Sequence, residues 1–240
     1  MTNASVDFGN TRIKIGIFEN QKLLDVFRIG TLAETAELLK SYPVENAIVS
    51  SVTMSSIEIS KELKMLKSLL FLNSNTPLPI KNNYSTPKTL GYDRIAAAVG
   101  ANHRFPNQNC LIIDIGTTIK YDLVTAQNTF EGGIISPGKQ MRFKALHTFT
   151  KKLPLLTSET IPDLIGNSTE SCIQSGVMNG IVAEINGIIE KYVKKQSVKV
   201  IICGGDASNF ESQINYPTFA APNLVLEGLN RILYYNVKNT

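Results

Sequence analysis

A five-residue pattern that occurs twice constrains the fold of this chain more than any other feature. Asp7-Phe8-Gly9-Asn10-Thr11 and Asp114-Ile115-Gly116-Thr117-Thr118 share an aspartate, an apolar residue, a glycine, a small polar residue and a threonine. The two copies begin 107 residues apart (114 − 7 = 107), which is the size of a domain. Because a repeat of this period indicates duplication, the sequence predicts two related α/β halves, residues 1–105 and residues 106–240.

The same order of β-rich runs surrounds each copy of the pattern. Alternating apolar residues predict three successive strands in each half, with turn residues between them. Thr31 is expected to cap a helix, because Glu34 stands at the capping-box position. The further predictions are strands at 4–8, 12–18, 23–29, 47–52, 69–72, 111–115, 119–125, 129–136 and 198–202, helices from 31 and at 55–66, 93–103, 169–194 and 223–235, and a loop at 73–90.

Composition excludes several classes of protein. A net charge of +4 without a dense basic patch argues against nucleic-acid binding, and no apolar run approaches the ~20 residues of a membrane span. Three irregularly spaced cysteines predict neither a disulfide framework nor a zinc site, and fit reduced thiols. Because the first residues show no basic and apolar leader pattern, we expect a cytoplasmic protein without nucleic-acid or membrane partners.

The first turn has the chemistry of a phosphate site. Gly9 allows the backbone to approach an anion, and turn N–H groups with amide and hydroxyl side chains can bind phosphate oxygens. Asp7 would repel a phosphate unless a cation such as Mg²⁺ lay between them. Lys14 on the next strand could contact a phosphate as a point charge. The alternative is a hairpin whose Asp and Asn side chains only satisfy backbone groups, and the second copy weakens that alternative.

Two facing turns of this kind would clamp a nucleoside triphosphate between the halves. The nucleoside end would need an open surface, which Cys203-Gly204-Gly205-Asp206-Ala207 could supply after a predicted strand. The alternative for this segment is an ordinary turn between a strand and a helix.

Phosphoryl transfer to an alcohol also requires a group that orients the hydroxyl and accepts its proton. Asp93, in Gly91-Tyr92-Asp93-Arg94 at the start of a predicted helix, is the candidate for this base. Arg94 beside it could pair with a substrate carboxylate. The alternative is an aspartate that caps the helix and an arginine on its surface.

These motifs together resemble those of the type III pantothenate kinases, which belong to the superfamily of acetate and sugar kinases, heat-shock chaperones and actin. The resemblance covers nearly the whole chain, and the combination of a G-x-D-R with a G-G-x-I-x-P-G is its most specific part. The matching segments are DFGNTRIK (7–14), TPKTLGYDR (86–94), DIGTTIKYD (114–122), GGIISPG (132–138), GNSTESCIQSG (166–176) and GGD (204–206).

The resemblance implies a fold, a reaction and a set of site residues. The fold would be the ASKHA fold, two duplicated ribonuclease H-like domains with mixed sheets flanked by helices. The reaction would transfer the ATP γ-phosphate to the 4′-hydroxyl of pantothenate, the first step of coenzyme A biosynthesis, with Mg²⁺ and a monovalent cation (K⁺ or NH₄⁺) as cofactors. The family works as a homodimer with the pantothenate pocket at the subunit interface.

Roles follow for individual residues of this chain. Asp93 would be the catalytic base, Asp7 would hold Mg²⁺ through phosphate or water, and Asp114 would hold the monovalent cation. The ATP-binding set would be Asp7, Phe8, Gly9, Asn10, Thr11, Arg12, Ile13, Lys14, Thr117, Gly204 and Gly205, and the pantothenate-binding set Tyr84, Gly91, Tyr92, Asp93, Arg94 and Thr169.

One residue departs from the family pattern. Lys120 stands where a small hydroxyl residue is frequent. If Lys120 faces the cleft, its ammonium could compete with the monovalent cation or replace it. An assay with and without K⁺ in a Tris buffer tests this hypothesis, and an unchanged rate would show that the cation is dispensable.

Two rival functions share parts of this pattern. Another kinase of the superfamily, acting on a sugar or a carboxylic acid, would carry the phosphate turns but not the G-x-D-R beside TPKTLG. A regulatory accessory factor would bind nucleotide without turnover, and the intact Asp93 argues against it. An assay with ATP, Mg²⁺ and pantothenate separates all three.

Overall fold

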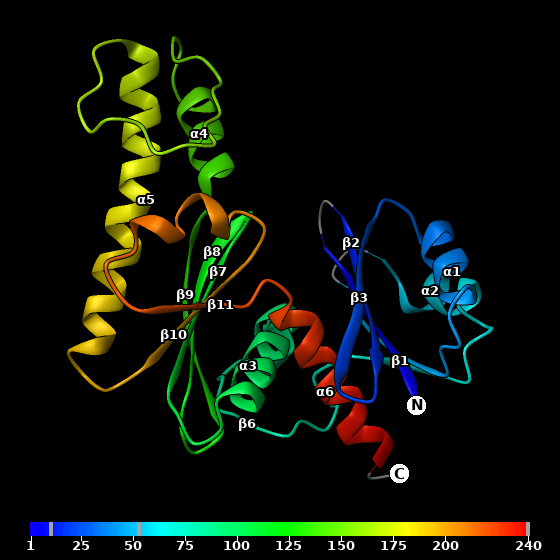
Figure 1. The fold of residues 1–240 in the computed structure, drawn as a ribbon. Helices are drawn as coiled ribbons and strands as arrows, with labels where there is room; N and C mark the ends of the chain where they lie inside the picture. Colours follow the sequence, from blue (N-terminus) through cyan, green and yellow to red (C-terminus); the bar gives the residue numbers. More distant parts are fainter. Residues whose placement is uncertain (10–11, 52–53, 239–240) are drawn as a thin grey trace. The chain divides into compact units, whose positions relative to one another are not determined.

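A computed structural model describes residues 1–9, 12–51 and 54–238 of the chain. The chain divides into two compact units, each built on a sheet flanked by helices (Figure 1). The first unit comprises residues 1–107, 125–131 and 223–240, and the second comprises residues 108–124 and 132–222.

The first unit contains a five-stranded mixed sheet in the order β3-β2-β1-β4-β5. Strands β1, β2 and β3 form an antiparallel meander, and β1, β4 and β5 run parallel. The bounds are β1 Thr2–Phe8, β2 Ile13–Glu19, β3 Lys22–Ile29, β4 Asn46–Ser51 and β5 Ser68–Phe71. A two-residue strand, β6 (Lys81–Asn82), pairs in parallel with Thr129 and Phe130 at the start of β9.

Helices cover both faces of this sheet. Helix α1 (Leu32–Lys40) and helix α2 (Ser56–Glu62) pack against the face that carries Ala4, Val6 and Phe8. Helix α6 (Leu224–Lys238) covers the other face, and α3 (Tyr92–Arg104) packs along α6 (Figure 1). The two helices approach so closely that a Cβ at Gly228 would stand 1.8 Å from the carbonyl oxygen of Ala96. The alanine-rich helix α3 therefore packs tightly against α6.

The second unit contains strands in the order β11-β10-β7-β8-β9. Strands β7 (Cys110–Ile115) and β8 (Thr118–Val124) form an antiparallel hairpin, and β10 (Lys199–Cys203) runs parallel to both β7 and β11 (Thr218–Ala220). Strand β9 spans Thr129–Pro137. The long helix α5 (Thr169–Val193) packs its isoleucine-rich face on this sheet, and α4 (Lys139–Thr148) packs beside α5 (Figure 1).

Most of the predicted elements are present, with bounds shifted by one or two residues. The capping box at Thr31 and Glu34 is confirmed. The helix predicted at 55–66 is shorter than expected, because it begins after its cap Ser55 and ends at Glu62. Val52, at the end of a predicted strand, lies outside the described residues. Helix α4 was not predicted, because its sequence carries no continuous apolar stripe and buries only Lys139 and Phe143.

The compact units differ from the predicted halves in two segments, residues 125–131 and the C-terminal residues 223–240, which both belong to the first unit. The predicted boundary after residue 105 lies two residues before the break between Asn107 and Gln108, but residues 223–238 belong to the first unit. The reason is that α6 buries its apolar face on β1, β2, β4 and α3, all in that unit. Among the described residues, no helix is long and apolar enough to cross a membrane.

Candidate functional site

The first predicted phosphate turn follows β1. Asp7 pairs in register with Lys14 on β2 and with Ser50 on β4, and Phe8 pairs with Ile13. Phe8 and Ile13 are buried in the core under α1 and α2, so only their backbone groups remain for a ligand. Arg12 is exposed. Asn10 and Thr11, which belong to the predicted ATP-binding set, lie outside the described residues.

The carboxylate of Asp7 lies on the polar face of β1. Because side chains alternate along a strand, Asp7 shares this face with Asn3 and Ser5, whereas Ala4, Val6 and Phe8 face the helices α1 and α2. Asn3 donates a hydrogen bond to the side chain of Asn230 on α6 and accepts one from Asn46. The face of β1 that carries Asp7 therefore presents polar side chains, of which Asn3 is hydrogen-bonded to Asn230 of α6 and Asn46 of β4.

The second predicted phosphate turn joins β7 to β8. Asp114 and Lys120 pair directly across the two strands, and the Lys120 Nζ lies 2.7 Å from Asp114 Oδ2. Both side chains are largely buried, at 18% and 15% exposure respectively. Thr117 at the tip is exposed. Its carbonyl oxygen accepts a hydrogen bond from the N–H of Gly138, so the segment 132–138 holds the tip of this turn.

The predicted nucleoside corner lies beside the second turn. Cys203 pairs with Asp114 between the parallel strands β10 and β7, and the Asp206 N–H donates to the carbonyl oxygen of Ile115. Gly204 has a φ of +99°, and a Cβ there would stand 2.2 Å from that carbonyl and 2.5 Å from Asp114 Oδ1. Only glycine fits this position. The structure thus brings Asp114, Thr117, Gly204 and Gly205 into one region of the second unit.

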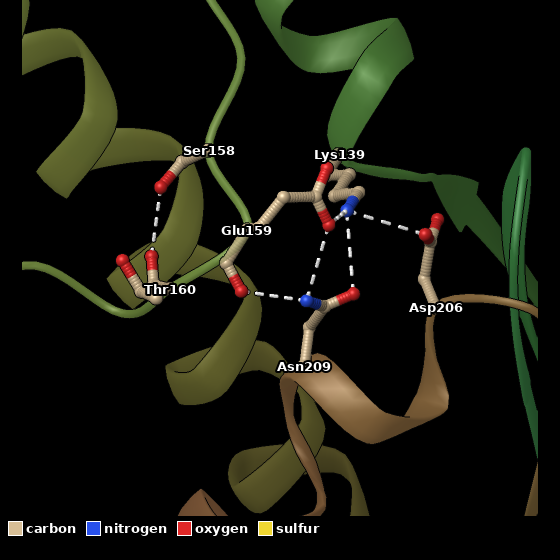
Figure 2. Close-up of polar contacts among 6 residues, drawn as sticks. All are labelled: Lys139, Ser158, Glu159, Thr160, Asp206 and Asn209. Atoms are coloured by element: carbon tan, nitrogen blue, oxygen red, sulfur yellow. Dashed lines mark hydrogen bonds and ion pairs between the residues drawn. The ribbon is translucent and has the colours of Figure 1, made fainter.

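Lys139 links the corner after β10 to the loop that contains Glu159. Its ammonium contacts Glu159 at 2.7 Å and Asp206 at 3.3 Å, and it donates to Asn209 Oδ1 (Figure 2). Asn209 also donates to the Glu159 backbone carbonyl. The side chain of Lys139 is only 3% exposed, whereas that of Glu159 is 71% exposed. The hydrogen bond from Lys139 lowers the pKa of Glu159 from its ordinary value.

The predicted base stands in the first turn of α3. The Asp93 carboxylate turns back on the helix start and accepts a hydrogen bond from the Arg94 N–H at 2.9 Å. Gly91 is the N-cap residue, and a Cβ there would stand 2.6 Å from Asp93 Oδ1. The aspartate therefore does contact the helix terminus, as the capping alternative expected, and it remains half-buried rather than enclosed.

Arg94 is buried, which contradicts the alternative of a surface arginine. Only 5% of the residue is exposed. Its guanidinium lies 5.3 Å from the ring centroid of Tyr84 and 5.8 Å from that of Phe130, and Nη1 donates to the Tyr84 hydroxyl at 3.4 Å. Stacking of this kind holds a guanidinium in a fixed plane. Tyr84, Gly91, Tyr92, Asp93 and Arg94 are all in the first unit, and Thr169, at the first position of α5, is in the second.

Sequence reasoning missed two polar networks of the second unit. One is the Lys139 cluster, and the only available signal was the position of Lys139 directly after the motif GGIISPG. The other is centred on Glu184 of α5, which accepts hydrogen bonds from Tyr121 and Ser136 and pairs with Arg142. Burial and the bond to Glu184 raise the pKa of Tyr121. These residues are distant in the sequence, so no local pattern marks them.

A cage of protein ligands for a metal ion is not found in the part of the chain that the structure describes. Its residues contain no group of three or more His, Cys, Asp or Glu side chains that could hold an ion. Mg²⁺ in kinases usually takes one or two carboxylates and completes its shell with water and substrate phosphates. A single carboxylate such as Asp7 beside a glycine turn fits that pattern.

Comparison with known proteins decides the family. The family model for type III pantothenate kinases matches residues 5–191. The type III pantothenate kinase of Christiangramia forsetii is 46% identical over 239 residues, and the match covers 98% of both chains. That of Cytophaga hutchinsonii is 45% identical, over 98% of this chain and 100% of the relative. The chain belongs to the type III pantothenate kinase family.

Solved structures that resemble this chain confirm the ASKHA fold. A protein described as a Baf family transcriptional activator from Campylobacter jejuni matches with a TM-score of 0.63 at 19% identity, covering 98% of this chain and 99% of that one. A sugar kinase from Cytophaga hutchinsonii, at 13% identity, covers 97% of this chain and 99% of its own, with a TM-score of 0.51. MreB5 of Spiroplasma citri matches with the same TM-score at 14% identity, covering 100% and 99%.

Proposed function

We propose that this protein transfers the γ-phosphate of ATP to the 4′-hydroxyl of pantothenate, the first step of coenzyme A biosynthesis. Membership of the type III pantothenate kinase family, over residues 5–191, is the observation that carries the proposal. The placement of Asp93 beside a buried Arg94 supports it, because an alcohol acceptor that is also an acid needs both a base and a cationic partner.

The turn after β1 is the proposed site of the ATP phosphates and Mg²⁺. Backbone groups of Phe8, Gly9 and Ile13 and the side chain of Lys14 would face the phosphates, with Asn10, Thr11 and Arg12 completing the predicted set. Asp7 would hold Mg²⁺ through water and a phosphate oxygen. When bound, the ion neutralises charge on the transferred phosphoryl group.

The turn after β7 and the corner after β10 are the proposed sites for the rest of the nucleotide. Thr117 is exposed at the tip of its turn, so its hydroxyl is available to a phosphate oxygen. A Cβ at Gly205 would meet nothing within 4 Å, which leaves open space for a ribose or a base. The Lys139 bridge to Asp206 would hold this corner in shape.

Asp93 is the proposed base, and Arg94 the proposed partner of the pantothenate carboxylate. The transition state of phosphoryl transfer is loose, so positioning the hydroxyl in line matters more than the strength of the base. The bond from the Arg94 N–H fixes the direction of the Asp93 carboxylate. Tyr84, which packs against the Arg94 guanidinium, together with Gly91, Tyr92 and Thr169, would complete the pantothenate site.

A coupled assay that follows ADP release tests the proposed reaction. Purified protein with ATP and Mg²⁺ should release ADP when pantothenate is added, and it should remain inactive with glucose or acetate in place of pantothenate. Activity with a sugar or acetate alone would favour another kinase of the superfamily. Nucleotide binding without turnover on any acceptor would favour an accessory factor.

We also propose that the protein works as a homodimer with the pantothenate pocket at the subunit interface, and that it is cytoplasmic. Large exposed apolar side chains of the second unit support the dimer, because association would remove their apolar surface from water. They include Ile135, Phe149, Leu155, Leu164 and Ile165, which are 58–86% exposed. The three free cysteines fit a reducing compartment.

A paired substitution tests the dimer. Ile165→Glu should shift the protein toward monomer in analytical ultracentrifugation and lower turnover, because a buried charge opposes association. Ile57→Glu is the matched control, since Ile57 is 81% exposed on α2 of the first unit. A wild-type protein that sediments as an active monomer would refute the proposed dimer.

The monovalent cation that the family resemblance implies at Asp114 stays a prediction. Its proposed ligand is the same carboxylate that pairs with Lys120 at 2.7 Å.

A further inference from the structure

The pairing of Asp114 with Lys120 is built into the strand register. The two residues lie directly opposite each other on antiparallel strands, on the same face of the sheet. Their Cα positions are therefore fixed by the hairpin ladder rather than by a mobile loop. The Lys120 Nζ reaches Asp114 Oδ2 at 2.7 Å, which is a charge-assisted hydrogen bond.

Burial separates this pair from an ordinary surface ion pair. Lys194 and Glu190 on α5 also pair at 2.7 Å, but their side chains are 72% and 50% exposed. Lys120 and Asp114 are 15% and 18% exposed. Attraction between charges grows as water is excluded, and salt screens a buried pair less than an exposed one. The Lys120 ammonium therefore stays on Asp114 under conditions in which the α5 pair would be weakened.

The surroundings of Asp114 leave little room for an additional ion. Oδ2 is engaged by Lys120, and the backbone of Gly204 lies so close to Oδ1 that a Cβ there would stand 2.5 Å from it. A K⁺ ion binds through several oxygen atoms that replace its water shell. A carboxylate with one oxygen bound to an ammonium and the other close to the Gly204 backbone is a poor member of such a shell.

A lysine side chain carries the same chemistry as one of the two expected ions. Its head group is an alkylated ammonium with a single positive charge and three N–H donors, and NH₄⁺ differs from it by one N–H. A free ion must be bound from solution, and its benefit depends on its concentration. A tethered ammonium is always present at the site.

We infer that the Lys120 ammonium replaces the monovalent cation at Asp114, so that this protein binds MgATP without K⁺ or NH₄⁺. The inference rests on the proposed kinase function for the role of the second turn in nucleotide binding. Lys120 neutralises the carboxylate that would otherwise repel the phosphates, and it holds the β7–β8 hairpin so that Thr117 faces the nucleotide.

Nucleotide binding to the wild-type protein is the first test. The dissociation constant for a non-hydrolysable ATP analogue with Mg²⁺ is measured by calorimetry in Tris with KCl, NH₄Cl or tetramethylammonium chloride at equal ionic strength. The three values should agree within about twofold. A dissociation constant that falls about tenfold or more with K⁺ or NH₄⁺, but not with tetramethylammonium, overturns the inference.

Removal of the built-in charge is the second test. Lys120→Thr should bind the analogue about tenfold more weakly in tetramethylammonium chloride and recover most of that loss in KCl or NH₄Cl. The unfolding temperature of the variant should rise with K⁺ in the same way. Lys194→Thr, which removes the exposed pair, should show neither effect. A Lys120→Thr protein whose affinity is the same in all three salts contradicts the inference.

The two arms also separate this inference from the proposed reaction. The binding experiments contain no pantothenate, so they report on the cation even if the acceptor is another alcohol. The wild-type arm requires no variant and decides the question even where Lys120→Thr does not fold. A protein that binds nucleotide equally well in every salt but never phosphorylates pantothenate would refute the proposed function and leave the cation inference standing.

Discussion

The two Asp-x-Gly-x-Thr turns occupy matching places in two sheets, yet they differ in what surrounds the aspartate. Asp7 lies opposite Lys14 and beside Ser50, and its loop closes between Phe8 and Ile13. Asp114 lies opposite Lys120 and beside Cys203, and its shorter loop closes between Ile115 and Ile119. Gly204 covers the second carboxylate, and Gly138 supports the tip of the second turn.

The two copies of a duplicated unit can therefore take different roles. The strand register, which places a lysine opposite each aspartate, is common to both copies. The neighbours supplied by later parts of the chain distinguish the copies, because β10 and the segment 132–138 belong to the second unit. In the proposed function, Asp7 holds Mg²⁺ beside the ATP phosphates, whereas the charge of Asp114 is neutralised by Lys120.

Removal of the base should have the largest effect, because neither turn can substitute for it. Asp93→Asn should lower turnover by roughly 100-fold or more, while nucleotide affinity stays close to that of the wild type. The asparagine oxygen can still accept the bond from the Arg94 N–H, so the helix start is retained. Steady-state kinetics and calorimetry measure the two quantities. Asp163→Asn, at an exposed position, is the control. Near-normal turnover of Asp93→Asn would show that Asp93 is not the catalytic base.

Matched substitutions of the two aspartates separate the roles of the two turns. Asp7→Asn should weaken Mg²⁺-dependent nucleotide binding about tenfold or more, because the proposed metal ligand is lost. Asp114→Asn should instead destabilise the fold by up to about 3 kcal/mol, because it leaves the largely buried Lys120 ammonium without its carboxylate. Calorimetric binding and urea unfolding distinguish the two outcomes. Equal losses of nucleotide affinity in the two variants, with equal stability, would show that the two aspartates have the same role.

Substitutions of the two glycines after β10 test how closely this segment packs against the second turn. Gly204→Ala should cost about 2 kcal/mol or more in stability, because φ is +99° and the new Cβ would meet the Ile115 carbonyl at 2.2 Å. Gly205→Ala should change stability by less than about 1 kcal/mol, since its Cβ would meet nothing within 4 Å. Urea denaturation of both variants gives the difference. Equal stability of the two would mean that Gly204 is not held against the second turn.

The smallest effect is expected at the Lys139 bridge, which lies beside the second turn. Glu159→Gln should reduce stability at neutral pH by less than about 1 kcal/mol, because Glu159 is 71% exposed and water screens the pair. The pKa of Glu159 is lowered in the folded state, so its contribution is present above the ordinary carboxyl pKa and disappears as the pH falls through the lowered value. Unfolding curves of wild type and variant should therefore converge in acid. A difference in stability between wild type and variant that grows as the pH falls would contradict this expectation.

Sequence patterns predicted the hairpins and the repeat because strand alternation and Asp-x-Gly turns are local features. They also placed Asp93 at the start of a helix and Thr31 at a cap, since capping depends on residues three apart. Helix α4 was missed because it buries Lys139. A lysine is expected at the surface when its partners, here Glu159 and Asp206, are not known. The pairing of α6 with the first unit likewise depends on contacts between residues more than 120 positions apart, such as Arg104 and Glu227.

Conversion of pantothenate in a buffer without K⁺ or NH₄⁺ tests the kinase activity and the role of Lys120 together. Purified protein, ATP, Mg²⁺ and pantothenate are incubated in Tris with tetramethylammonium chloride, and the products are identified by mass spectrometry and ³¹P NMR. We expect 4′-phosphopantothenate and ADP in equal amounts, formed at a rate that KCl leaves unchanged within about twofold. ADP without phosphopantothenate, or no product with any salt, would contradict the assignment as a pantothenate kinase. Phosphopantothenate formed only when KCl or NH₄Cl is present would contradict the role given to Lys120.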